Sequence, residues 1–243
     1  MTITSPDNQK LKLARKLRER KGREREGLFT SEGEDLVEAG LAAGAEPQFL
    51  LTAAGSGLAE RWGGEEVEPE LLAAASALGS GTRVIAVWPL GWSEQPATIS
   101  LYLHGVGDPG NVGTIIRSAD ALIGSPVVLG PGCADPFSPK AVRASMGSVF
   151  AQAPVRAGIE ATREPRAALV ARGGSAPEAL VGAATLCLGA EREGLPAEVL
   201  AECEAEVTIP LRPGAESLNV AAAAAIACER LSSLAMPEAQ PDA

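Results

Sequence analysis

The sequence is poor in aromatic residues, in histidine and in paired cysteines. Only 3% of its 243 residues are aromatic, so nucleic-acid binding by rows of stacked aromatic side chains is not expected. His104 is the single histidine, and the four cysteines are scattered without a C-x-x-C pair: Cys133, Cys187, Cys203 and Cys228. This spacing argues against structural zinc and predicts free thiols and no bound metal.

Long hydrophobic runs are also missing. No apolar segment approaches the roughly 20 residues that a membrane-spanning helix needs. The N-terminal stretch MTITSPDNQK has no hydrophobic signal core. We therefore expect a soluble, cytoplasmic protein with no membrane partner. Its length allows one or two compact domains.

Positive charge is scarce overall but concentrated in one stretch. The formal net charge is −10, yet residues 10–25, KLKLARKLRERKGRER, hold nine of the 21 Lys and Arg residues. Attraction between charges is screened within about 10 Å at ordinary salt, so a local basic patch can bind phosphates on an acidic protein. The alternative is a solvated helix face that keeps the chain soluble.

The first 90 residues alternate between helical and strand patterns. Apolar residues at helical spacing in LKLARKL predict one basic helix over residues 7–22. Strand and helix patterns then alternate, which predicts a small α/β domain over residues 1–92. The turn-rich stretch GWSEQPA, residues 91–97, is the expected linker.

The alternation restarts at residue 98. Apolar runs such as VVLG and ATLCLG are nearly continuous, which predicts a parallel sheet covered on both faces; VFAQAPV is expected to be another strand. The resulting α/β domain spans residues 98–236 and ends in the alanine-rich helix SLNVAAAAAIACERLSSLA. Residues 237–243 are expected to form a flexible tail.

The loop GVGDPGNVGTIIR, residues 105–117, fits two patterns. Residues 105–110 spell G-x-G-x-x-G, the fingerprint of a dinucleotide-binding loop. Pro109 removes a backbone N–H where a pyrophosphate needs donors, and the next strand lacks the acidic residue of that fingerprint, so this pattern is weak. The other pattern, N-x-G-x-x-x-R, makes Asn111 the N-cap of a helix over residues 112–123.

Two further glycine-bearing loops follow predicted strands. Parallel sheets bind ligands at the carboxyl ends of their strands, so these loops are candidate sites. LGAEREGLP, residues 188–196, places Glu191 between glycines. IPLRPGAESLNVAAAAA, residues 209–225, delivers Ser217 and Asn219 at a helix start, where Ser217 is a candidate N-cap.

In this order, the three motifs resemble those of the SpoU or TrmH-like branch of the SPOUT RNA methyltransferases. They are N-x-G-x-x-x-R, L-G-x-E-x-x-G-L and I-P-x-x-x-x-x-E-S-L-N-V-A-x-A, and SPKAVRASMG also matches an intermediate stretch of the family. The resemblance covers residues 98–235 densely. The N-terminal FTSEGEDLVEAG is similar to the small α/β RNA-binding domain that precedes the catalytic domain in many members.

The resemblance implies a fold, a reaction and partners. The fold is the α/β knot, a parallel-sheet catalytic domain whose C-terminal segment forms a trefoil knot. The reaction is methyl transfer from S-adenosyl-L-methionine to a ribose 2′-hydroxyl of RNA, with 23S ribosomal RNA as the expected substrate. Members of the family work as homodimers with each active site at the subunit interface.

The resemblance also assigns residues. Catalytic positions are matched by Asn111, Arg117, Glu191, Ser217 and Asn219, and cofactor-binding positions by Gly189, Ile209 and Leu218. Because arginine is a very weak acid and stays charged, Arg117 is expected mainly to grip the target phosphate, with any role as a base secondary. RNA contacts are expected from Lys10, Lys12, Arg15, Lys16, Arg18 and Arg143.

Other interpretations stay open at this point. Transfer RNA is an alternative substrate to ribosomal RNA. The glycines of residues 105–110 leave an NAD-dependent Rossmann oxidoreductase as a second function. A non-catalytic RNA-binding relative that kept the fold is a third.

Overall fold

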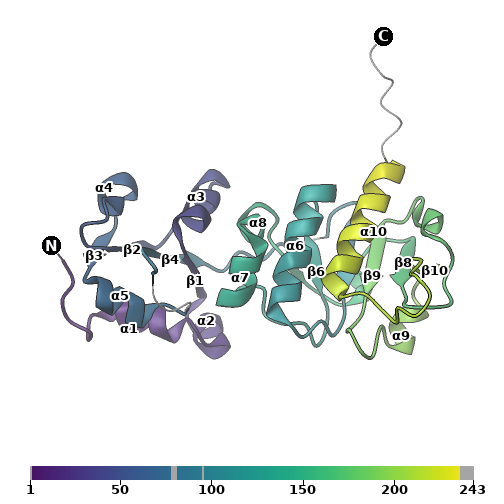
Figure 1. The fold of residues 1–243 in the computed structure, drawn as a ribbon, viewed down its shortest axis with the longest axis horizontal. Coiled ribbons are helices and arrows are strands. Elements are labelled where there is room, and N and C mark those ends of the chain that lie inside the picture. The colour runs from purple at the N-terminus through teal and green to yellow at the C-terminus, as the bar shows by residue number, and fades with distance from the viewer. Residues whose placement is uncertain (1, 78–80, 95, 236–243) are drawn as a thin grey trace, which may run out of the picture. The chain divides into compact units, whose positions relative to one another are not determined.

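The computed structural model describes residues 2–77, 81–94 and 96–235. Its contacts divide the chain into two compact units, which are described separately (Figure 1). Unit 1 comprises residues 1–91 and 135–151, and unit 2 comprises residues 92–134 and 152–243. The expected flexible tail, residues 237–243, lies outside the described residues.

Unit 1 is built on a four-stranded mixed sheet in the order β1-β4-β2-β3. The central strand β4 pairs antiparallel with β1 and β2, and β3 runs parallel to β2. The strands are β1 (Leu28–Glu32), β2 (Phe49–Ala53), β3 (Glu65–Val67) and β4 (Val84–Pro89). The helices are α1 (Gln9–Lys16), α2 (Arg20–Glu26), α3 (Glu34–Ala42), α4 (Leu58–Trp62), α5 (Pro69–Ala75), α7 (Pro139–Ser145) and α8 (Ser148–Ala151).

Helices cover both faces of this sheet. α1 and α5 pack together on one face, and their apolar side chains share a core with β2 and β4 (Figure 1). On the other side, the ring of Phe29 in β1 lies 5.0 Å from that of Phe137, and Trp88 in β4 lies 4.9 Å from Phe150. Because of these aromatic contacts, residues 135–151 pack into unit 1, whereas the sequence-based boundary assigned them to the domain over 98–236.

The basic N-terminal stretch forms two helices instead of the single helix expected over residues 7–22. α1 ends at Lys16 and α2 begins at Arg20. The close approach of the two helices depends on Gly22, where an added Cβ would lie 2.0 Å from the backbone oxygen of Lys16. The helical spacing of apolar residues predicted α1 correctly, but it could not reveal this backbone contact.

Unit 2 contains a fully parallel six-stranded sheet in the order β10-β8-β9-β5-β6-β7, which confirms the predicted parallel α/β fold. The strands are β5 (Ser100–Leu103), β6 (Val127–Leu129), β7 (Val155–Arg156), β8 (Arg166–Leu169), β9 (Thr185–Leu188) and β10 (Ala205–Val207). The helices are α6 (Pro109–Ile123), α9 (Ala197–Leu200) and α10 (Val220–Ala235), with 3-10 turns η1 (Ile159–Ala161) and η2 (Pro177–Leu180). VFAQAPV, residues 149–155, is not one strand, because α8 includes its first three residues and only Val155 belongs to β7.

The two long helices of unit 2, α6 and α10, lie side by side (Figure 1). Their buried residues form one core with alternate residues of the strands, including Leu101 and Leu103 of β5. Tyr102 and Cys187 point to the opposite face, where they pack with α9. The small residues Ala224 and Ala227 of α10 are fully or almost fully buried in the first core, as close helix packing requires.

None of the helices in the described part of the chain combines the length and apolar character that crossing a membrane requires.

All four cysteines are free thiols. Burial raises the pKa of Cys228 to about 12, so this thiol is protonated and unreactive at neutral pH.

A buried ion pair joins the N-terminal helices of unit 1 to residue 135. The Arg23 guanidinium donates to Asp135 Oδ2 from Nε at 2.9 Å and from Nη2 at 2.6 Å. Its Nη1 donates to the backbone oxygens of Leu17 and Arg18. Only 3% of the Arg23 side chain is exposed, so loss of either charge leaves the other buried without its partner.

We therefore expect Arg23→Ala to lower the free energy of unfolding of unit 1 by about 3 to 5 kcal/mol. Arg20→Ala is the matched control, because Arg20 pairs with Glu24 on the same helix in solvent, and such pairs contribute less than about 1 kcal/mol. Urea unfolding followed by the fluorescence of buried Trp88 measures both variants. Equal losses in the two variants would contradict the role of the buried pair.

Candidate functional site

A cavity of about 370 Å³ opens at the carboxyl ends of β8, β9 and β10. Its walls come from the segments that follow these strands, 169–171, 188–195 and 209–218, and from the start of α10. Its volume lies in the range of small-molecule sites, and this edge is where parallel α/β sheets bind ligands. The three residues expected at cofactor-binding positions all line it: Gly189, Ile209 and Leu218.

The loop after β9 is closed on itself beside this cavity. Ala190 N–H donates to Gly194 O at 3.2 Å, and Gly194 N–H donates to Ala190 O at 2.9 Å. Gly189 is buried against this closure, because an added Cβ would lie 2.1 Å from the carbonyl carbon of Gly194. Gly194 has a φ of 69°, a conformation that glycine adopts without strain. The two glycines therefore fix the shape of the loop.

Three side chains from the three sequence motifs meet next to this loop. Asn111 Nδ2 donates to Glu191 Oε1. Asn219 Nδ2 lies 3.1 Å from Asn111 Oδ1 and 3.2 Å from Glu191 Oε1. We call these three residues the polar cluster. Its hydrogen bonds bring together motifs that are separated by up to 108 residues in the sequence.

The helix caps around the polar cluster differ from those expected. Asp108, not Asn111, caps α6: its Oδ1 accepts the Asn111 N–H at 3.0 Å, and Pro109 occupies the first helical position, where its missing N–H costs nothing. Asn219, not Ser217, caps α10, with its Oδ1 accepting from Ala221 N–H at 2.9 Å. Both asparagines thus keep their amide groups available to Glu191.

Two expected catalytic residues lie outside the polar cluster. Arg117 is exposed on α6, and its guanidinium makes no hydrogen bond or ion pair with any described residue. Ser217 is exposed at the cavity wall and has no hydrogen-bond partner in the described part of the chain. Both side chains are therefore open to a ligand.

The expected RNA contacts in the basic stretch are engaged within unit 1. Lys10 pairs with Glu65, Lys12 with Asp7 and Lys16 with Glu26. Arg15 donates to a backbone oxygen of Pro6, and Arg18 donates to three backbone oxygens at the end of α5. By contrast, Arg143 on α7 is exposed and makes no ion pair or hydrogen bond through its guanidinium with the described residues.

The single histidine also lies at the carboxyl edge of the sheet. His104 directly follows β5. Its backbone N–H donates to Leu188 O at 2.9 Å, and its ring Nδ1 lies 3.2 Å from the Tyr102 hydroxyl. Burial raises the pKa of Tyr102 to about 12, so this hydroxyl stays protonated at neutral pH. Within the described residues, no group of His, Cys, Asp or Glu is arranged to hold a metal ion.

Fold and site together define an α/β protein with a cavity of small-molecule size at the carboxyl edge of a parallel sheet. The family model described as SpoU rRNA Methylase family matches residues 98–229, more than half of the chain. A second model, described as MRM3-like substrate binding domain, matches residues 8–87. The chain therefore belongs to the SpoU rRNA methylase family, and the Rossmann oxidoreductase interpretation is set aside.

Relatives of known sequence support the same assignment. The 23S rRNA (guanosine(2553)-2'-O)-methyltransferase RlmP of Bacillus subtilis strain 168 is 34% identical over 241 residues, which cover 92% of this chain and 96% of that protein. The 23S rRNA (uridine(2479)-2'-O)-methyltransferase of Streptomyces viridochromogenes is 35% identical over 133 residues, 48% of this chain and 46% of its own length.

The fold has close counterparts among solved structures. The AdoMet-bound rRNA methyltransferase from Sinorhizobium meliloti matches with a TM-score of 0.85 and 30% identity, covering 98% of this chain and 99% of that chain. An RNA 2'-O ribose methyltransferase structure matches with a TM-score of 0.78 and 28% identity, covering 96% and 99% of the two chains. The parallel-sheet fold of unit 2 is thus that of SPOUT methyltransferases.

Because Asn219 both caps α10 and joins the polar cluster, two substitutions separate these roles. Asn219→Ser keeps a capping oxygen but is too short to span the cluster, so we expect its free energy of unfolding to fall by only a few tenths of a kcal/mol. Asn219→Ala loses both roles, and we expect a loss of about 1 kcal/mol. Urea unfolding monitored by circular dichroism measures the difference. Equal losses would mean that the cap contributes nothing.

Proposed function

We propose that this chain transfers a methyl group from S-adenosyl-L-methionine to a ribose 2′-hydroxyl of 23S ribosomal RNA. The observation that carries this proposal is the polar cluster of Asn111, Glu191 and Asn219 beside the cavity that Gly189 and Leu218 line. The family assignment and the printed activities of the relatives support it.

The cavity suits S-adenosylmethionine in size and chemistry. Apolar side chains such as Leu195, Leu200 and Ile209 line it, together with the exposed backbone of loops that carry glycines. Gly189 lines the cavity with backbone alone, because Gly194 and Leu195 of the same loop leave no room for a Cβ there. When bound, S-adenosylmethionine supplies a methyl group on a positively charged sulfonium.

Catalysis in this proposal depends mainly on positioning. The ribose oxygen forms a bond to the methyl carbon while the carbon–sulfur bond breaks, its electron pair stays on sulfur, and the hydroxyl proton leaves to solvent. Alignment of the attacking oxygen with that bond is worth several kcal/mol. We assign Arg117 to holding the phosphate of the target nucleotide, because its guanidinium is exposed and always charged. Asn111, Glu191 and Asn219 hold the loops that form the site, and Ser217 faces the cavity.

The knot and the dimer are further parts of the proposal. The segment after β10 lines the same cavity as the loop after β9. Asn219, which follows that segment, donates a hydrogen bond to Asn111 on α6. This path is what a C-terminal segment threaded back through the fold would follow. Leu122 on α6 and Ile226 on α10 are partly exposed apolar side chains on adjacent helices, which suits a second copy of the chain. We infer a trefoil knot and a homodimer on this basis.

Substrate binding is assigned to the N-terminal domain, residues 1–92, with residues 98–236 as the methyltransferase domain. The match to a substrate-binding domain over residues 8–87 supports this division. The proposed RNA contacts are Arg143 on α7 and the basic residues Lys10, Lys12, Arg15, Lys16 and Arg18. Ion pairs within unit 1 lower the net positive charge that α1 and α2 offer to phosphates. We place the reaction in the cytoplasm.

The direct test of the function uses purified protein, methyl-labelled S-adenosylmethionine and unmodified 23S ribosomal RNA. A methylated 2′-oxygen cannot attack the neighbouring phosphate, so we expect the label in dinucleotides that resist alkaline hydrolysis. Transfer RNA serves as the comparison substrate and should remain unlabelled. Label in the bases, or in transfer RNA alone, would contradict the proposal.

Arg117→Lys tests the positioning role. The lysine keeps the charge but loses the planar fork that binds a phosphate through two parallel hydrogen bonds, so we expect kcat/KM to fall roughly 100-fold. The affinity for S-adenosylmethionine, measured by calorimetry, should stay unchanged. Arg163→Lys, an exposed arginine before β8, is the control. Near-normal turnover by Arg117→Lys would rule out bidentate phosphate binding.

A further inference from the structure

The loop that carries Glu191 presents a second charged residue whose role is unassigned. Residues 190–194 form a closed loop with Glu191, Arg192 and Glu193 at its tip, and all three line the cavity. We propose that Arg192 binds a phosphate of the RNA next to the target ribose and thereby positions that ribose at the cavity. This inference rests on the proposed function and adds a residue to it.

The loop holds Arg192 in a defined place. The two backbone hydrogen bonds between Ala190 and Gly194 close its base, and Gly189 packs directly beneath that closure. On the N-terminal side of Arg192, Glu191 accepts hydrogen bonds from two asparagine amides. A side chain on such a fixed backbone loses less conformational freedom on binding than one on a mobile loop.

The charges at the cavity favour an RNA contact at this position. Among the described residues that line the cavity, Arg192 is the one cation, and Glu191 and Glu193 are negative. The chain carries a formal net charge of −10, so attraction of RNA to the site needs positive charge placed close to it. A guanidinium at the rim supplies that charge where the target nucleotide must enter.

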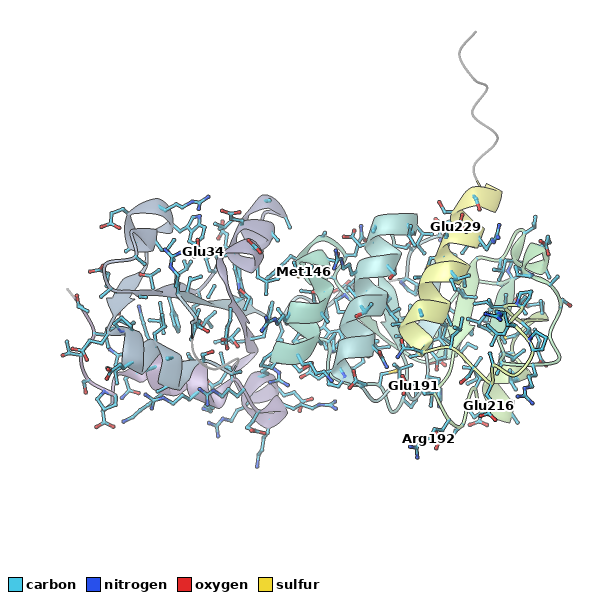
Figure 2. All side chains as sticks on the ribbon, viewed as in Figure 1. Glu34, Met146, Glu191, Arg192, Glu216 and Glu229 are labelled. Carbon is cyan, nitrogen blue, oxygen red and sulfur yellow. The ribbon has the colours of Figure 1, made fainter. Side chains whose placement is uncertain are left out.

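The Arg192 side chain is available for this contact. It is exposed, and it makes no hydrogen bond or ion pair with any described residue, although two glutamates flank it. In Figure 2 the Arg192 side chain extends outward past Glu191, away from the protein, where an RNA phosphate can contact it. Most cations of α1, in contrast, are paired with acidic residues of unit 1.

The experiment compares Arg192→Ala, Arg192→Lys and the control Arg163→Ala, which removes an exposed arginine before β8. Equilibrium binding of 23S ribosomal RNA is measured at several salt concentrations without cofactor. For Arg192→Ala we expect RNA affinity to fall roughly 10-fold and the slope of log K against log salt to decrease in magnitude by about 0.7 to 0.9, the loss of one phosphate contact. Arg192→Lys should restore the slope, and Arg163→Ala should match the unchanged protein.

Methyl-transfer kinetics and cofactor binding complete the test. We expect Arg192→Ala to raise KM for RNA while the Kd of S-adenosylmethionine stays the same. An Arg192→Ala salt slope equal to that of Arg163→Ala would overturn the inference, and so would a weakened cofactor affinity with unchanged RNA affinity, which would place the guanidinium on the cofactor carboxylate. RNA binding is measured without turnover, so these outcomes are independent of whether the unchanged protein methylates ribose.

Discussion

The polar cluster is the interaction on which the site depends. Glu191 lies in the loop after β9, Asn111 in the first turn of α6, and Asn219 just before α10, and their hydrogen bonds join segments 28 to 108 residues apart. The side chain of Asn111 is available to the polar cluster because Asp108, not Asn111, caps α6. Asn219 caps α10 with its Oδ1, which leaves its Nδ2 for the polar cluster. Formation of the site and the start of both long helices are therefore coupled.

Much of unit 2 could be predicted from the sequence because its signals are local. Nearly continuous apolar strands indicated a parallel sheet, and the rule that ligands bind at the carboxyl ends of such strands indicated that the glycine-bearing loops are candidate sites. What could not be predicted depends on which of several possible contacts forms. Asn111 and Asp108 are both good caps by residue type, and only the observed hydrogen bond selects Asp108. The packing of residues 135–151 into unit 1 depends on aromatic and ionic contacts that no local pattern shows.

The charge that RNA can contact also could not be predicted from the sequence. Nine cations within residues 10–25 predicted a phosphate-binding patch, but a count of charges says nothing about their partners. In unit 1, Lys10, Lys12 and Lys16 each face a carboxylate, and Arg23 is buried. An ion pair between exposed groups is weak, about 1 kcal/mol or less, so RNA phosphates can compete for these lysines, whereas they cannot reach Arg23. The density of positive charge in the sequence therefore overstates the charge available to RNA.

The two overlapping patterns after β5, G-x-G-x-x-G and N-x-G-x-x-x-R, both contribute to the same site. Gly105 has a φ of 69°, and a Cβ added there would lie 3.3 Å from the Cβ of Ala190. Gly132, in the loop after β6, approaches Gly105 so closely that its own Cβ would lie 3.1 Å from the Gly105 Cα. Gly105 therefore lets the loops after β5, β6 and β9 pack together at the carboxyl edge of the sheet. The G-x-G-x-x-G pattern begins with a residue that shapes the site, and the overlapping pattern that starts at Asn111 supplies the side chains that act in it.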